Sequence, residues 1–108
     1  MPFTKRLKEA RRAVGVSQEK LGLEIGLDPA VASARMNQYE RGVHFPNLGT
    51  LQQIAGALRL PLAYFFCESD EEARMLKLLH SLTTDQKHEA IRLVEALVAA
   101  GSERASES

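Results

Sequence analysis

Cysteine is nearly absent from this 108-residue sequence, in which Cys67 is the single thiol and tryptophan does not occur. One cysteine cannot close an internal disulfide, and it leaves no paired thiols for a zinc site. Because Cys67 directly follows Tyr64, Phe65 and Phe66, we interpret it as a small apolar filler. We therefore expect no bound metal, and we expect the protein to work in a reducing cytoplasm.

Long apolar runs are missing as well. No run reaches the length that spans a membrane, and the Lys-Arg-Leu-Lys segment at 5–8 begins an amphipathic stretch rather than a signal peptide. The sequence has no β-type alternation, no repeat, no nucleophile–base set, no paired carboxylates and no glycine-rich phosphate loop. His80 and His88 are separated and form no ligand pattern. The pattern predicts an all-α protein that has no membrane partner, needs no cofactor and is not an enzyme.

Charge is balanced over the whole chain but not along it. Residues 1–66 carry nine Lys and Arg against five Asp and Glu, whereas residues 67–108 carry five against nine. A basic half beside an acidic half points to a polyanionic partner for the first half. Chance combined with an acidic helical tail explains the same asymmetry equally well.

Helical spacing of apolar residues predicts five helical segments in the first part of the chain. They cover residues 3–14, 17–25, a third segment that begins between 29 and 32 and ends at about 40, 47–58 and 62–66. Capping residues precede most of them, and glycines that can adopt the left-handed conformation follow. These residues are Thr4, Ser17, Asp28-Pro29 and Asn47 at the starts and Gly15, Gly26 and Gly42 at the ends.

Two longer helices are predicted in the remainder of the chain. The first covers about 69–81, and the second begins at a capping box formed by Thr83 and Gln86. Gly101 is expected to stop the second helix. The chain then divides into a domain over 1–67, a two-helix extension over 68–101 and a polar, disordered tail over 102–108.

Two of the segments flank a glycine-centred turn. Gly22 lies where two helices would cross closely, and Gly26 lies in the turn between them. The second of these helices has apolar residues on one side and amide and guanidinium side chains on the other. In a helix-turn-helix DNA reader, one helix crosses the DNA backbone and the next enters the major groove.

Over residues 3–66 the sequence resembles the XRE/Cro-like helix-turn-helix transcription regulators of bacteria and phages. Gln18 matches the family's frequent glutamine at the start of the second helix, and Gly22 stands where the family usually has alanine. The other matching positions are Gly26, Met36, Tyr39, the motif Glu40-Arg41-Gly42 and the closing segment 60–66. The resemblance implies a lambda-repressor-like five-helix DNA-binding domain, here followed by a C-terminal helical hairpin.

One spacing departs from the family pattern. Between Gly26 and the apolar positions of the third helix, the sequence has about four more residues than usual, which is about one helical turn. Either the third helix begins a turn early, at Pro29, or the turn before it is longer.

The helical period places Ala32, Met36, Tyr39 and Glu40 on the inward side of the third helix. On the opposite side, amides suit adenine, a guanidinium suits guanine and a small methyl group suits thymine. We predict base reading by Ala34, Asn37, Gln38 and Arg41. We predict phosphate contacts by Gln18, Ser33, Arg35 and His44, with Lys5, Arg6, Lys8 and Arg12 as weaker candidates. An ordinary solvated helix face would have the same composition.

Glu40 lies on the inward side, which is an awkward place for a charge. In the family that the sequence resembles, an arginine of the first helix commonly pairs with this glutamate, and Arg11 is at the matching position. The resemblance therefore implies an architectural ion pair between Arg11 and Glu40. Two independently solvated charges are the alternative.

The apolar stripes of the last two helices are wider than one amphipathic face requires. A hairpin of about forty residues cannot bury them alone, so they pack on the first domain or on another chain. We predict a homodimer, because a twofold axis doubles the base contacts of a groove reader, and the alternative is a monomer whose tail folds back. The predicted interface residues are Met75, Leu79, Leu82, Ile91, Val94, Leu97 and Val98.

From these patterns we expect a transcriptional regulator of repressor type that binds double-stranded DNA sequence-specifically as a homodimer. The alternative is an antitoxin-type interaction module, whose C-terminal helices neutralise a small protein partner.

Overall fold

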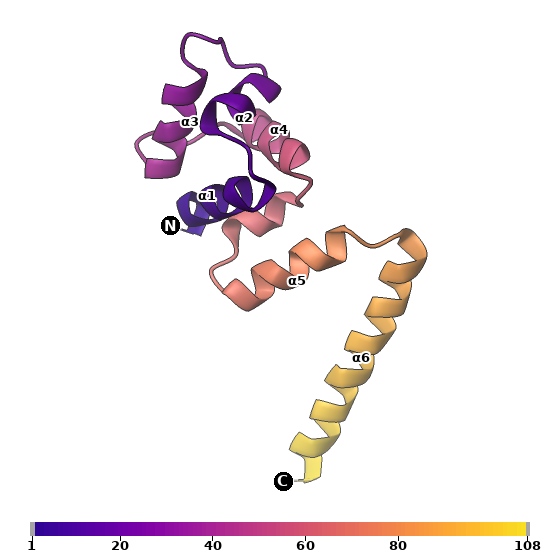
Figure 1. Cartoon of the computed structure of the whole chain (residues 1–108). Coiled ribbons are helices and arrows are strands. Elements are labelled where there is room, and N and C mark those ends of the chain that lie inside the picture. The colour runs from indigo at the N-terminus through magenta and orange to yellow at the C-terminus, as the bar shows by residue number, and fades with distance from the viewer. Residues whose placement is uncertain (1, 108) are drawn as a thin grey trace.

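The computed structural model describes the backbone of residues 2–107 and the side chains of residues 2–104. Its elements are α1 (Pro2–Val14), α2 (Gln18–Glu24), α3 (Ala32–Arg41), α4 (Leu48–Leu58), the 3₁₀ helix η1 (Leu62–Phe66), α5 (Asp70–His80) and α6 (Thr84–Glu107) (Figure 1). Residues 2–107 contain no strand, which confirms the all-α prediction. Among the helices of this part, none is long and apolar enough to cross a membrane.

One hydrophobic core lies between α1, α2, α3, α4 and η1. Each of these elements contributes side chains that are almost inaccessible to water, and burial of each large one stabilises the fold by about 1.5–3 kcal/mol. The largest are Phe3, Leu7, Leu21, Met36, Leu51, Ile54 and Phe65. The five elements therefore form a unit with a core of its own, as the five-helix prediction requires.

Helices α2 and α3 cross closely because Gly22 has no side chain. A Cβ atom at this position would lie 2.8 Å from the carbonyl oxygen of Ala32 and 2.9 Å from its Cβ. Ala32 is itself fully buried. This close approach at Gly22 and Ala32 sets the position of α3 relative to α2.

Two of the four helix starts predicted in the first part of the chain are confirmed by hydrogen bonds of the capping side chains. The Ser17 hydroxyl accepts from the Lys20 N–H at 3.0 Å, and the Asn47 carbonyl oxygen accepts from the Thr50 N–H at 2.8 Å. The prediction for Thr4 is wrong, because α1 already includes Pro2, whose fixed φ suits the first turn of a helix.

The connection from α2 to α3 contains the extra residues of this chain. The carboxylate of Asp28 accepts from the Ala30 N–H at 2.8 Å, two residues on, and the Val31 N–H donates to the Asp28 carbonyl at 2.9 Å. This is a turn stabilised by its own side chain, not a helix cap. Helix α3 therefore begins at Ala32, and an early start at Pro29 is wrong.

The C-terminal extension is an open pair of helices. Ser69 caps α5, and Thr83 and Gln86 form a reciprocal capping box at the start of α6, with distances of 2.9 and 3.2 Å. Helix α6 extends away from the five-helix domain, so the molecule is 62 Å long but only 29 Å by 23 Å across (Figure 1).

Helix α6 does not end at Gly101, so the prediction that this glycine stops the helix is wrong. It continues through Gly101 to Glu107, so residues 102–107 are helical rather than disordered, and residue 108 lies outside the described residues. Glycine weakens a helix by about 1 kcal/mol but does not forbid it.

Candidate nucleic-acid interface

Helix α3 has one buried face and one accessible face. Ala32, Met36, Tyr39 and Glu40 are buried against the domain, as the helical period predicted. Gly42 ends the helix with a φ of 75°, which a residue with a side chain adopts only at a cost. The buried face therefore anchors α3 to the domain and leaves the opposite face accessible.

Four side chains of the outer face form one stripe along α3. Ala34, Asn37, Gln38 and Arg41 follow one another at spacings of three, one and three residues, which places them together on a helix surface. Ala34 and Arg41 are exposed, and Asn37 and Gln38 are half-buried. Within the described side chains, none of the three polar ones has a hydrogen-bond partner, so their donors and acceptors are available to a ligand.

The residues predicted to contact phosphate belong to α2, to α3 and to the loop after α3. Gln18 is the first residue of α2 and is half-buried, whereas Ser33 is an exposed residue of the first turn of α3. Arg35 is half-buried on the same helix, and His44 is exposed in the loop that follows α3. Helix α2 packs against α3 (Figure 1).

A buried ion pair fixes the C-terminal end of α3. The Nε of Arg11 lies 2.6 Å from one carboxylate oxygen of Glu40, and Nη2 lies 3.1 Å from the other. Their side chains are 12% and 3% exposed. The hydrogen bond to Glu40 outweighs burial and raises the pKa of Arg11 above its ordinary value. Since Nη1 also donates to the Val16 carbonyl at 2.9 Å, the pair ties α1 and the following turn to α3.

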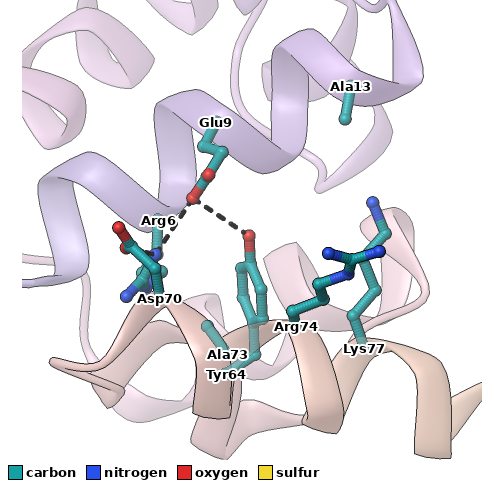
Figure 2. A pocket seen from close by; sticks show the side chains of 8 residues that line it. All are labelled: Arg6, Glu9, Ala13, Tyr64, Asp70, Ala73, Arg74 and Lys77. Atoms are coloured by element: carbon teal, nitrogen blue, oxygen red, sulfur yellow. Dashed lines mark hydrogen bonds and ion pairs between the residues drawn. The ribbon is translucent and has the colours of Figure 1, made fainter.

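A second buried arginine was not recognised from the sequence. The prediction of Arg6 as a weaker phosphate contact is wrong, because the residue is 1% exposed and cannot reach DNA. The signal was its place on the apolar stripe of α1, three residues after Phe3 and four before Ala10. Figure 2 shows its guanidinium beside Glu9 and Asp70, at the edge of an open cavity of about 450 Å³ between α1, η1 and α5.

The predicted interface residues of the tail are largely uncovered. Met75, Leu79, Ile91, Val94, Leu97 and Val98 are all exposed, Leu97 to 72%, and Leu82 is half-buried. Between residues 84 and 104 no side chain is buried, so α6 does not fold back on the domain. Helix α5 packs on the domain, through the buried Ala73 and through η1. The two helices border an apolar groove of about 260 Å³.

Three comparisons with known proteins agree with this geometry. A helix-turn-helix family model matches residues 7–65. The crystal structure of the transcriptional regulator BswR is 47% identical, with a TM-score of 0.84, and the alignment covers 90% of this chain and 96% of that one. Two uncharacterized HTH-type transcriptional regulators, from Sinorhizobium medicae (strain WSM419) and Rhizobium meliloti (strain 1021), are each 33% identical over 61 residues. That match covers 56% of this chain and 41% of each relative.

Proposed function

This chain belongs to the XRE-type helix-turn-helix family, and from that premise we propose that it is a transcriptional regulator that binds double-stranded DNA sequence-specifically as a homodimer. The observation that carries the proposal is the polar stripe of α3, whose amide and guanidinium groups are free while the opposite face is buried. A helix held in this way can enter the major groove without rearrangement of the domain.

The stripe suits direct reading of base edges. Asn37 and Gln38 can each donate to and accept from the N6/N7 edge of adenine, and Arg41 can donate twice to guanine. Ala34 allows close approach and can contact a thymine methyl group. Gln18, at the N-terminus of α2, is proposed to meet a phosphate together with the free N–H groups of that helix turn.

The exposed apolar surface of α6 supports the proposed homodimer. Helix α6 exposes an apolar surface that its own chain leaves uncovered, and large contiguous apolar surfaces are rare on monomers. A twofold axis through this surface would present two copies of α3 to successive turns of DNA, about 34–36 Å apart. A dimer bound over a promoter can block transcription, so we propose a repressor, and we propose that it acts in the cytoplasm.

Selection of bound duplexes from a random library tests binding, symmetry and half-site together. We expect a near-palindromic site and an affinity that falls steeply with salt, because each neutralised phosphate releases counterions. Gln38→Ala should cost about 1–3 kcal/mol of binding and relax preference at one base pair per half-site. Gln18→Ala should instead weaken all sites by a similar factor.

Two outcomes would count against the proposal. Failure to enrich any duplex at low salt would refute DNA binding. A monomer that co-purifies with a small protein held on α5 and α6 would favour the antitoxin-type alternative. Light scattering on the purified chain distinguishes that monomer from a dimer, since one chain has a mass of 12.0 kDa.

A further inference from the structure

The guanidinium of Arg6 is held by a set of acceptors that belong mainly to the link between η1 and α5. Nε donates to the Cys67 carbonyl at 2.9 Å and Nη2 to the Glu68 carbonyl at 3.3 Å. Nη1 donates to Asp70 at 2.8 Å and to Glu9 at 3.1 Å. We call this set, Arg6 with Glu9, Cys67, Glu68 and Asp70, the Arg6 clamp, of which Figure 2 shows Arg6, Glu9 and Asp70.

The Arg6 clamp connects two parts of the chain that are more than sixty residues apart in sequence. Three of the four acceptors lie at 67–70, the short connection through which the tail leaves the domain. The clamp is reinforced at its edge, where Lys5 donates to Asp70 at 2.9 Å. Hydrogen bonds from Lys5 and then from Arg6 hold the pKa of Asp70 below its ordinary value.

Each nitrogen of the buried guanidinium donates to at least one acceptor, and any other arrangement would leave the charge without these partners in the interior. Ala73 is the one buried residue of α5. Without the clamp, no hydrogen bond from Arg6 would hold the segment 67–69 against α1. The clamp therefore sets the direction of α5 relative to α1, and through the domain core relative to α3.

In the proposed homodimer, the direction of α5 determines where each recognition helix lies relative to the twofold axis. We propose that Arg6 is a positioning residue that sets the separation of the two half-sites that the protein accepts, without contacting DNA. This inference rests on the proposed function, since it requires two copies of the reader. It assigns to α1 a specificity for spacing that is separate from the base specificity of α3.

The experiment measures affinity for a series of inverted repeats that share one selected half-site and differ in spacing by single base pairs. One base pair changes the separation by about 3.4 Å and the rotation by about 35°, so a rigid dimer should discriminate strongly. For the wild-type protein we expect an affinity loss of about tenfold or more when the spacing departs from the optimum by one or two base pairs.

Arg6→Met removes the clamp, and Asp70→Asn weakens it from the exposed side, where the Asp70 side chain is 67% exposed. Both should flatten the spacing profile, Arg6→Met to within about threefold, while half-site base preference and dimer mass stay unchanged. Arg74→Met is the matched control, because Arg74 is an exposed arginine bordering the same cavity and makes none of the clamp's bonds. It should keep the wild-type profile.

Three results would overturn the inference. Folded, dimeric Arg6→Met with a wild-type spacing profile would refute it directly. If Arg6→Met does not fold, Asp70→Asn decides, and an unchanged profile for that variant refutes the inference. A wild-type protein that is monomeric, or that binds single half-sites as well as repeats, would instead refute the proposed homodimer and the inference with it.

Discussion

Cutting the Arg11–Glu40 pair should destabilise the domain by an amount that depends on which partner is removed. Arg11→Met leaves the Glu40 carboxylate, 3% exposed, without its two hydrogen bonds. The expected loss is about 3–5 kcal/mol, the range for an uncompensated buried charge. Glu40→Gln keeps an oxygen that can accept from Arg11, which also retains its bond to Val16. The expected loss is then about 1–3 kcal/mol.

The double variant Arg11→Met/Glu40→Gln should lose less than the sum of the two single losses, with a coupling energy of about 1–3 kcal/mol. The assay is urea unfolding at neutral pH, where a change in the midpoint at constant slope reports stability. In thermal unfolding, each kilocalorie should move the midpoint of so small a domain by about 4–8 °C.

An ion pair on α6 supplies the control. Arg92 and Glu89 are 2.7 Å apart, but their side chains are 69% and 63% exposed. Arg92→Met should therefore cost less than about 1 kcal/mol. Additive losses for Arg11 and Glu40, each as small as that of the control, would refute the claim that this pair is a buried structural link.

Three further perturbations test other parts of the structure. Gly22→Val should cost about 1–3 kcal/mol, because its Cβ meets the backbone of α3, whereas Gly56→Ala, with open space around it, should be neutral or stabilising in the same unfolding assay. Val94→Asp should convert the dimer to a 12.0 kDa monomer in light scattering, while the domain keeps its circular dichroism and melting behaviour. Because hydrogen bonds from two cations lower the pKa of Asp70 below 3.8, its contribution to stability is present above that pH and lost as the pH falls through the folded value. The stability difference between the wild type and Asp70→Asn should therefore vanish in strong acid, and a difference that persists below pH 3.8 without change would contradict this assignment.

Features that depend on a few neighbouring residues could be predicted from the sequence. Ser17, Asn47 and the Thr83–Gln86 box each satisfy N–H groups three residues away or less, so their role is legible in a short window. The inward face of α3 followed from period alone, because Met36 and Glu40 are one turn apart on one helix.

Features that depend on competing or distant partners could not be predicted from the sequence. Asp28-Pro29 has the composition of a helix start, but the Asp28 side chain bonds two residues ahead and stabilises a turn instead. Arg6 has the composition of a solvated cation, and its burial depends on carbonyl groups at 67 and 68, which no local pattern connects to α1. Gly101 has the composition of a helix stop, but α6 continues through it to Glu107.

Helix α1 carries the buried Arg6 and the largely buried Arg11, and they attach it to two different parts of the molecule. Arg11 holds Glu40 at the end of α3, whereas Arg6 holds the link to α5. The two residues are five positions apart, so one rigid helix of 13 residues determines how the reading helix and the tail are placed relative to each other. Replacing the two residues should therefore have different effects on DNA binding. Arg11→Met would disturb α3 and change the base preference but not the preferred spacing of half-sites. Arg6→Met would change the preferred spacing but not the base preference. If Arg11→Met and Arg6→Met both changed base preference, or both changed the preferred spacing, α1 would only pack in the core and would not position α3 and the tail separately.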